Sequence, residues 1–401
     1  MNILILSNKP PYPTKDGSSL ATLNMSIGLA EHGNKVKILA FTTQKHPCKI
    51  EQIPTEIRAL IDFEFVNINT SISRFKAITN ILFSRLPFNI ERFIDENFSQ
   101  KLAGILNQYT FDIIQLEGLY LMPYIQDIRK VCKTPIVYRS HNIEHEIWNR
   151  IASNETNPIK AWYFKLLSKR IAKMEGEIAQ QINALVAISK RDENWFLSRN
   201  FSNPSISIPS GYKCYGTSNL TGFTNNDICF LGSLDWIPNQ EGLIWFLDNI
   251  WPKIKANQPS ISLHIAGRNA PTDLAERFKN EIGINYHGEI QNAKDYLNSF
   301  SILVVPLLSG SGIRVRIIEG MMLQKAIITT SIGIEGIDAK GGEEAIIVDT
   351  PKDFAEATIE LINNQSLRAR IAEKARNFAM SNYDNTVLTE KLIEFYKQIV
   401  Q

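Results

Sequence analysis

Short apolar segments alternate with helix-like segments along almost the whole chain, and this alternation limits the fold more than any other feature. Residues 2–7 form the first predicted strand, a helix-like segment follows, and residues 35–41 form a second strand. Later strands are predicted at 112–117, 135–139, 184–189, 205–208, 227–231, 262–266, 302–306, 326–330 and 345–348. This repeated order predicts an α/β fold whose mostly parallel sheets are covered by helices on both faces.

The alternation breaks once, after residue 208, where a segment rich in Gly, Asn, Ser and Thr extends to residue 226. The chain has 401 residues, and domains usually contain about 100–200. We therefore predict two similar α/β domains, an N-terminal domain over 1–208 and a C-terminal domain over 209–383. Residues 384–401 are predicted to form a last helix that packs back toward the N-terminal domain.

The charge of the chain is nearly balanced, with 43 Lys and Arg against 41 Asp and Glu. A dedicated nucleic-acid-binding protein would carry a strongly basic stripe instead, so we expect no nucleic-acid partner. The halves differ, because residues 1–208 hold 25 basic and 19 acidic residues and residues 209–401 hold 18 and 22. The basic and apolar segment 74–92 either docks on anionic lipid or a phosphate-bearing acceptor, or packs as a core-facing helix with a solvated side.

The cysteines and the apolar runs indicate a compartment. Scattered cysteines without a CxxC pair favour a reducing cytoplasm and argue against a structural zinc site; they are Cys48, Cys132, Cys214 and Cys229. No run reaches the length of about 18 apolar residues that predicts a membrane-spanning helix. The start of the chain lacks the basic region of a signal peptide. We expect a cytoplasmic protein, with peripheral membrane contact left open.

The segment 309–319, which contains glycine and arginine, predicts an anion site. It follows the strand at 302–306 and opens a helix, and its small residues let a ligand approach the backbone. The free N–H groups of the helix start, the helix dipole and Arg314 together suit a diphosphate. Glu319 lies on the same helix face as Gly312 and Arg316, where it could accept hydrogen bonds from ribose hydroxyls. Alternatively, the glycines only make a turn, and Arg316 and Glu319 form a surface ion pair.

Residues 310–322 together with 325–336 resemble the donor-binding signature of family 4 glycosyltransferases, which have the glycosyltransferase-B fold. Other pieces match the family in the same order. Gly17-Ser18-Ser19 resembles its N-terminal glycine loop, and Ser140-His141-Asn142 resembles its central His motif. Residues 230–239, 265–268 and 287–289 resemble the strand ends of its C-terminal domain. The resemblance covers nearly the whole chain and is strongest over 227–349.

This resemblance implies two Rossmann-like domains that face each other across a cleft. It also implies a retaining transfer of a sugar from a nucleotide-sugar, without a required metal or other cofactor. His141 would line the reaction centre, and Glu319 would hold the nucleotide ribose. The donor-binding residues would be Gly17, Ser18, Gly232, Ser233, Asn239, Arg268, Ile290, Gly310, Ser311, Gly312, Ile313 and Arg316. Glu117 and Glu144 are candidates on the acceptor side.

The sequence departs from the family pattern at two places. Ser311 stands where the family has the first Glu of a paired-Glu motif, and Ser233 and Asn239 stand near its usual Arg and Lys. The leaving diphosphate still needs positive charge, because electrostatic stabilisation of the departing group is the main catalytic demand. We therefore assign Arg314 to that role, helped by Arg316 or Arg268. The catalytic candidates are then His141, Arg314 and Glu319.

Several of these residues have an alternative interpretation. His141, at a strand end, could only fix a loop, and Glu117 could be a capping residue. Residues 141–145 also match the H-x-x-E-H pattern of inverted zinc proteases, but that chemistry needs the pattern inside a helix. A further set of aromatic residues either stacks on a sugar or base or, more commonly, fills a core: Trp236, Trp245, Phe246 and Trp251.

Three functions are consistent with these patterns. The first is a retaining hexosyltransferase that moves a sugar from a UDP- or GDP-linked donor to a glycan or lipid-linked acceptor of a cell-envelope polysaccharide. The second is a non-hydrolysing nucleotide-sugar epimerase, which shares the fold but needs more acid and base carboxylates. The third is an inactive glycosyltransferase-like subunit that binds sugars or partners, which the Ser311 replacement favours.

Overall fold

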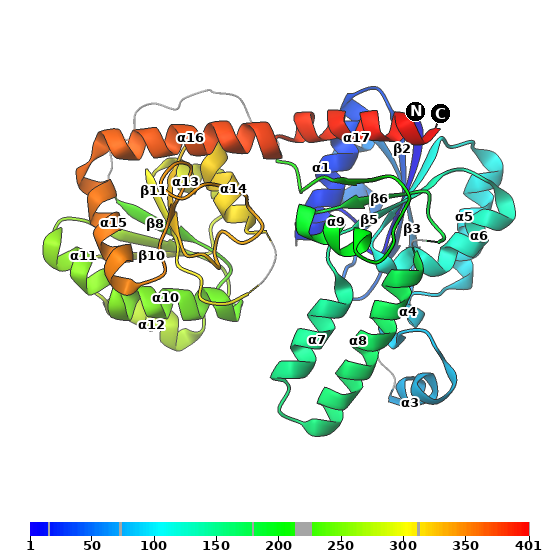
Figure 1. The fold of residues 1–401 in the computed structure, drawn as a ribbon, viewed down its shortest axis with the longest axis horizontal. Helices are drawn as coiled ribbons and strands as arrows, with labels where there is room; N and C mark the ends of the chain where they lie inside the picture. Colours follow the sequence, from blue (N-terminus) through cyan, green and yellow to red (C-terminus); the bar gives the residue numbers. More distant parts are fainter. Residues whose placement is uncertain (15–16, 72–73, 179, 213–226, 311–312, 401) are drawn as a thin grey trace. The chain divides into compact units, whose positions relative to one another are not determined.

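The computed structural model describes residues 1–400 except 15–16, 72–73, 179, 213–226 and 311–312, and it describes the backbone alone for 74–78. The chain divides into two compact units (Figure 1). Unit 1 consists of Met1–Lys213 and Asn385–Gln401, and unit 2 consists of Cys214–Asp384. Each unit has a parallel sheet with helices, so the predicted α/β fold class with two Rossmann-like domains is confirmed.

Unit 1 is built on a seven-stranded sheet in the order β3-β2-β1-β4-β5-β6-β7. Its strand pairs are all parallel, because a helical segment carries the chain from each strand back to the start of the next. The central strands are buried on both faces, which explains their continuous apolar runs. The strands are β1 (Asn2–Ser7), β2 (Lys35–Thr42), β3 (Ile61–Asn67), β4 (Ile113–Glu117), β5 (Ile136–Ser140), β6 (Ala184–Ala187) and β7 (Ser205–Ser207).

The helices of unit 1 cover both faces of this sheet (Figure 1). Two of them, α7 and α8, pack against each other as a long hairpin. The helices are α1 (Gly17–Glu31), α2 (Thr55–Leu60), α3 (Arg74–Phe83), α4 (Phe88–Glu91), α5 (Glu96–Gln108), α6 (Ile125–Val131), α7 (Glu144–Asn154), α8 (Pro158–Ile178), α9 (Lys190–Leu197) and α17 (Asn385–Val400). Short 3-10 turns lie at Ile50–Gln52 and Leu119–Tyr124.

Unit 2 repeats the design with a six-stranded parallel sheet in the order β10-β9-β8-β11-β12-β13. The strands are β8 (Ile228–Leu231), β9 (Leu263–Ala266), β10 (Ile284–Gly288), β11 (Ile302–Val305), β12 (Ala326–Thr329) and β13 (Ile346–Ile347). The helices are α10 (Ile237–Asn249), α11 (Trp251–Asn257), α12 (Thr272–Asn280), α13 (Ala293–Asn298), α14 (Val315–Met322), α15 (Pro351–Asn363) and α16 (Gln365–Tyr383). Phe246 and Trp251 belong to the core of this unit.

The C-terminal helix α17 belongs to unit 1, although the helix before it belongs to unit 2. Its buried apolar face, with Leu388, Leu392 and Phe395, joins the same hydrophobic cluster as Met25 and Leu29 of α1. The last helix is therefore part of the core of the unit in which the chain begins.

Strand β3 was not predicted from the sequence. It lies at the edge of the sheet, and every second residue from Ile61 to Phe65 is apolar. The intervening Asp62 and Glu64 bind the ammonium group of Lys37 on β2 at 2.5 and 2.7 Å. Alternation of this kind is the signal of a half-buried strand, and it could have found β3.

No helix in the described part of the chain is long and apolar enough to cross a membrane.

The contact between α1 and α17 supplies a test of the core of unit 1. A methyl group at Gly28 would overlap the hydroxyl of Thr389 on α17, whereas one at Gly104 on α5 would meet nothing. Thr389 is fully buried and has no room to retreat. We expect Gly28→Ala to lower the free energy of unfolding by about 1–3 kcal/mol. The control Gly104→Ala should raise it by about 0.5–1 kcal/mol, because alanine is the better helix former. Denaturant titration of both variants measures this, and equal effects would contradict the packing.

Candidate functional site

Unit 1 has a pocket of about 540 Å³ at the carboxyl ends of its central strands. Chain segments that follow β1, β2, β3, β4 and β5 all contribute lining residues. Strands β1 and β4 are neighbours in the sheet, and the chain continues from them toward opposite edges. In open parallel sheets, such a switch point is where ligands usually bind. Four predicted residues line this pocket together: Ser18, Glu117, His141 and Glu144.

The carboxylate of Glu117 is the centre of this site. It lies at the end of β4, in register with Arg139 on β5, and is 2% exposed. Its Oε2 atom is 2.6 Å from His141 Nε2 and 3.2 Å from Arg139 Nη1. The same atom accepts a hydrogen bond of 2.9 Å from the hydroxyl of Thr22 on α1. Glu117 is thus held by several donors and is not a helix cap.

Two opposing effects set the charge of Glu117. Burial by itself raises the pKa of this carboxyl, because it removes the charged form from water. The guanidinium of Arg139, the imidazole of His141 and the hydroxyl of Thr22 lower it more strongly, and the pKa falls to about 2. Glu117 is therefore ionised in the folded protein at neutral pH.

His141 takes its orientation from Glu117. Its Nε2 atom contacts the carboxylate, which favours the tautomer that carries a proton on this nitrogen. The other nitrogen, Nδ1, is buried and has no hydrogen-bond partner among the described residues. A neutral His141 held in this way offers the lone pair of Nδ1 to a hydroxyl group of a ligand, because His141 also lines the pocket.

Glu144 is the second carboxyl group in the pocket wall, and it opens helix α7. Burial and the nearby Glu175 raise its pKa to about 7, although Lys9 acts in the opposite direction. Glu175 accepts hydrogen bonds from the backbone N–H of Glu144 at 2.6 Å and contacts His145 Nδ1, also at 2.6 Å. Glu144 therefore keeps its proton to a higher pH than an ordinary glutamate does.

The zinc-protease interpretation of residues 141–145 does not fit this geometry. Helix α7 begins at Glu144, so His141 lies outside it. The two histidines also contact different carboxylates, since His141 binds Glu117 and His145 binds Glu175. Within the described part of the chain, no group of three or more His, Cys, Asp or Glu is placed to hold a metal ion.

Four further basic residues line the same pocket: Lys9, Lys45, His46 and Arg92. The sequence analysis indicated only Arg92 among them, as the last residue of the basic segment 74–92. Lys9 follows β1, Lys45 and His46 follow β2, and Arg92 follows α4 between β3 and β4, so only the parallel sheet brings them together. Of the ion pair between Glu117 and Arg139, the sequence analysis predicted only Glu117 as a site residue. A charged residue at the end of each of two apolar strands was the signal that could have found Arg139.

A second set of predicted residues gathers in unit 2, at the ends of β8 and β9. The side chain of Asn239 donates a hydrogen bond of 2.8 Å to the carbonyl of Ser233. Arg268 donates one of 3.0 Å to the Ser233 hydroxyl. A Cβ atom at Gly232 would lie 2.7 Å from the Asn239 amide nitrogen and would push that side chain away from Ser233. The structure thus brings together four donor-site candidates: Gly232, Ser233, Asn239 and Arg268.

Arg314 lies just before α14, on the segment that follows β11. Strands β8 and β11 are neighbours at the switch point of the second sheet. The Arg314 side chain is 8% exposed, and its guanidinium carbon lies 5.2 Å from the centre of the Trp236 ring. Gly310 has a φ of +111° and packs against both, since a Cβ atom there would lie 2.8 Å from Arg314 Nη2. Trp236 remains 38% exposed, unlike the core aromatics of this unit.

The remaining predicted residues are placed less tightly. Arg316 and Glu319 form the ion pair that the alternative interpretation expected, and both side chains are partly exposed. Ile313 packs against Gly336, and Ile290 is half-buried in the loop after β10. Gly17 is exposed at the first position of α1. Ser311 and Gly312 lie outside the described residues.

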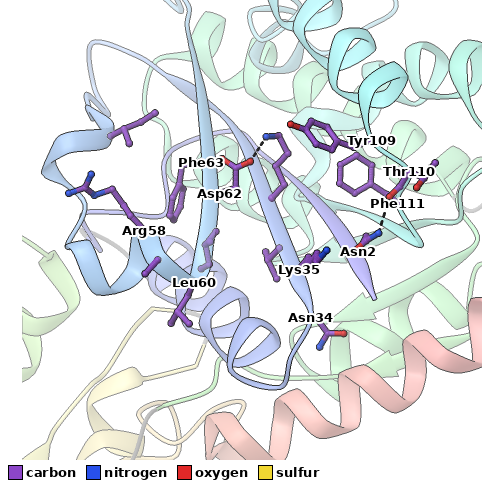
Figure 2. A pocket seen from close by; sticks show the side chains of 15 residues that line it. Asn2, Asn34, Lys35, Arg58, Leu60, Asp62, Phe63, Tyr109, Thr110 and Phe111 are labelled. Carbon is purple, nitrogen blue, oxygen red and sulfur yellow. Dashed lines mark hydrogen bonds and ion pairs between the residues drawn. The ribbon is translucent and has the colours of Figure 1, made fainter.

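Unit 1 has another pocket, of about 630 Å³, at the end of the sheet where strands β1, β2 and β3 begin (Figure 2). Asn2, Lys35 and Ile61 line it at the starts of β1, β2 and β3. Lys37, which also lines this pocket, forms ion pairs with the carboxylates of Asp62 and Glu64. None of the predicted site residues lines this pocket, so the sequence and the sheet topology both favour the carboxyl-end pocket.

Comparisons with known proteins indicate a family for part of the chain. Residues 225–364, which include the donor-site candidates of unit 2, match the family Glycosyl transferases group 1. The chain is 26% identical to a Klebsiella pneumoniae protein named an uncharacterized 44.6 kDa protein in the cps region, over 96% of both chains. It is 23% identical to the uncharacterized glycosyltransferase MJ1069 of Methanocaldococcus jannaschii, over 85% of this chain and 86% of that one.

Solved structures of other proteins share this fold. The crystal structure of Anabaena HepE in complex with UDP superposes with a TM-score of 0.66, at 14% sequence identity, over 99% of this chain and 100% of that one. The family match and this shared architecture confirm the resemblance that the sequence motifs indicated. Residues 225–364 therefore form a domain of the group 1 glycosyltransferase type, and the chain has the glycosyltransferase-B fold.

The buried Glu117 network predicts a specific loss of stability. Glu117→Gln removes the negative charge that compensates the buried Arg139, which should cost about 3–5 kcal/mol of unfolding free energy. Because the folded-state pKa of Glu117 is depressed, its stabilisation is present above pH 4.5 and is lost as the pH falls toward 2. The difference between wild type and variant should therefore shrink over that range in denaturant titrations.

A surface ion pair serves as the control. Glu343 contacts Lys374 at 3.3 Å, and both side chains are about half exposed. Glu343→Gln should cost at most about 1 kcal/mol. If Glu117→Gln costs no more than this variant, the buried network does not stabilise unit 1 in the way described.

Proposed function

We propose that this protein is a retaining glycosyltransferase that moves a sugar from a UDP- or GDP-linked donor to a glycan or lipid-linked acceptor. The family match over residues 225–364 is the observation that carries this proposal, since it contains the donor-site candidates of unit 2. The Klebsiella pneumoniae relative, whose name refers to the cps region, supports a role in making a cell-surface polysaccharide. The free cysteines Cys48, Cys132 and Cys229 suit a cytoplasmic location.

On the donor side, we propose that the diphosphate lies near the start of α14. Arg314 supplies the main positive charge there, with help from Arg268 and Arg316, so the transfer needs no metal ion. The first backbone N–H groups of α14 add hydrogen bonds to the anion. The partly exposed ring of Trp236 lies against the Arg314 guanidinium and is available to stack on a base or a sugar. When the donor binds, Glu319 gives up its ion pair with Arg316 and accepts hydrogen bonds from the ribose hydroxyls.

On the other side of the reaction, we propose that the acceptor occupies the pocket of unit 1. His141 acts at the reaction centre by accepting a hydrogen bond at Nδ1 from a sugar hydroxyl. Glu117 is a positioning residue, because its oxygens are engaged by Thr22, Arg139 and His141 and it has little exposed surface. Glu144 is the acceptor-side carboxyl that can exchange a proton near neutral pH.

These environments favour retention by attack from the face that the leaving group occupies. A double displacement would need a free carboxylate nucleophile. The oxygens of Glu117 are engaged by Thr22, Arg139 and His141, and the raised pKa of Glu144, about 7, lowers the share of its ionised form. In the proposed step, the bond between the sugar and the diphosphate breaks, and the acceptor oxygen forms the new bond to the same carbon. The acceptor proton passes to the departing phosphate oxygen.

A panel of nucleotide-sugars tests the reaction class. We expect nucleoside diphosphate to be released only when an acceptor glycan is present, without inhibition by a chelator, and with the donor's anomeric configuration kept in the product. Conversion of the donor sugar without acceptor would instead show an epimerase, and binding without turnover would show an inactive subunit. Thermal shifts with UDP and GDP identify the base, because a ligand of the native state raises the Tm.

Substitution of Arg314 tests the proposed charge compensation. We expect Arg314→Ala to lower kcat by about 100- to 1,000-fold, as for the loss of one preorganised donor to a developing anion. Arg277→Ala is the matched control, because Arg277 lies on α12 in ion pairs with Asp248 and Glu281. Its turnover should stay near that of wild type. Turnover of Arg314→Ala close to wild type would show that this role is misassigned.

A further inference from the structure

Helices α7 and α8 form a hairpin that extends away from the sheet of unit 1 (Figure 1). The hairpin has its own internal contacts. The rings of Trp148 and Phe164 lie 5.8 Å apart, and the hydroxyl of Ser168 donates a hydrogen bond of 2.8 Å to the carbonyl of His145. At the far end, Asn157 accepts hydrogen bonds from the first backbone N–H groups of α8. The hairpin is therefore a rigid projection.

The projection exposes large apolar side chains that its own packing does not use. Ile159 is 76% exposed and Trp162 is 59% exposed, both in the first turns of α8. Helix α3 lies against α8, because Arg170 donates hydrogen bonds to the carbonyl of Ile81 and to Asn80. At the end of α3, Leu82 is 67% exposed and Phe83 is 85% exposed.

These apolar side chains share one side of the projection. Ile159 and Arg170 are eleven residues apart, which is about three turns of helix, so Ile159 lies on the face of α8 that α3 contacts, about 16 Å along the helix from that contact. Trp162 follows Ile159 by three residues and lies next to it on the helix surface. We call Leu82, Phe83, Ile159 and Trp162 the apolar tip.

The helix surface next to the apolar tip is basic. Residues 158–173 contain five Lys and Arg and no Asp or Glu. Trp162, Lys165, Lys169 and Lys173 follow one another at three- and four-residue spacing and therefore line one face of α8. Lys165 and Lys169 are exposed, as is Lys173, which lies nearest to Glu177 at 3.7 Å. An aromatic residue at the tip is thus followed by a row of cations on long flexible stems.

We propose that the apolar tip and this lysine row dock on a bilayer that contains anionic phospholipids. The apolar side chains would enter the boundary between headgroups and acyl chains, and the lysines would reach the phosphates around them. A second copy of the chain fits less well, because a symmetric contact would set lysine against lysine. A nucleic acid would leave the aliphatic tip residues without a partner.

Docking in this way has a consequence for the pocket. Helix α7 begins at Glu144, which lines the pocket, and ends next to the apolar tip. Its eleven residues span only about 16 Å. The pocket would therefore be held close to the membrane surface, where a lipid-linked acceptor presents its glycan. The docking itself does not depend on the proposed transfer, since none of its residues lines the pocket.

Sedimentation of the full chain with vesicles tests the proposal. We expect wild type to bind vesicles of phosphatidylcholine mixed with phosphatidylglycerol at least about tenfold more tightly than phosphatidylcholine alone, with the difference falling as salt rises. The variants Ile159→Ser with Trp162→Ser, and Lys165→Glu with Lys169→Glu, should each lose about tenfold or more. The controls are Ile282→Ser, an 80% exposed residue of unit 2, and Lys253→Glu with Lys279→Glu. These should bind like wild type.

A fluorescence measurement distinguishes insertion from simple attraction. Brominated anionic lipid should quench part of the tryptophan emission, and Trp162→Phe should remove that part. Equal binding to both vesicle types, no loss in either double variant, or no quenching that depends on Trp162 would overturn the proposal. Vesicle-free dimers that the tip variant abolishes would also overturn it, in favour of a second copy. Turnover with a soluble acceptor should be unchanged in all five variants, so failure of docking and failure of the proposed transfer are separable.

Discussion

The carboxylate of Glu117 organises unit 1. It is buried at the end of a central strand and stays ionised because Thr22, Arg139 and His141 surround it. Gln115 on the same strand contacts Glu117 on one side and the hydroxyl of Tyr396 on the other. Tyr396 belongs to α17, so residues from the start, the middle and the end of the chain converge on one charge. Loss of any partner leaves a buried polar group uncompensated, which makes the arrangement specific as well as stable.

The two sheets explain why the candidate sites lie where they do. In each unit the strand order reverses direction once, between β1 and β4 in the first and between β8 and β11 in the second. Loops that follow neighbouring strands diverge there and leave room for a ligand. Glu117 ends β4 at the first switch point and His141 follows the neighbouring β5, whereas Gly232 and Gly310 follow the two strands at the second. The residues proposed to bind the acceptor and the donor therefore lie at the same kind of position, the switch point of a parallel sheet.

Particular residues show how far sequence reasoning reached. The apolar strands and the glycine-containing segment before α14 could be predicted from the sequence. A strand buried on both faces must be apolar, and a close approach to the backbone requires small residues such as glycine. Arg139, Lys9 and Lys45 were not identified as site residues, since they are distant from one another in sequence and a single charged residue forms no recognisable pattern. Arg316 and Glu319 were correctly placed on one helix face, but helix geometry alone could not decide between their contact with each other and contact with a ligand.

By itself, the sequence determined the fold class and indicated several of the residues near the two switch points. Those properties are local, because hydrophobic period, glycine placement and short motifs act over a few residues. Tertiary structure alone decided the charge state of Glu117, the orientation of His141 and the proton affinity of Glu144. It also decided which apolar side chains of α3 and α8 remain in water. The reason is that pKa values and exposure depend on what distant segments bring within a few ångströms, and only the packed sheet and its helices specify that.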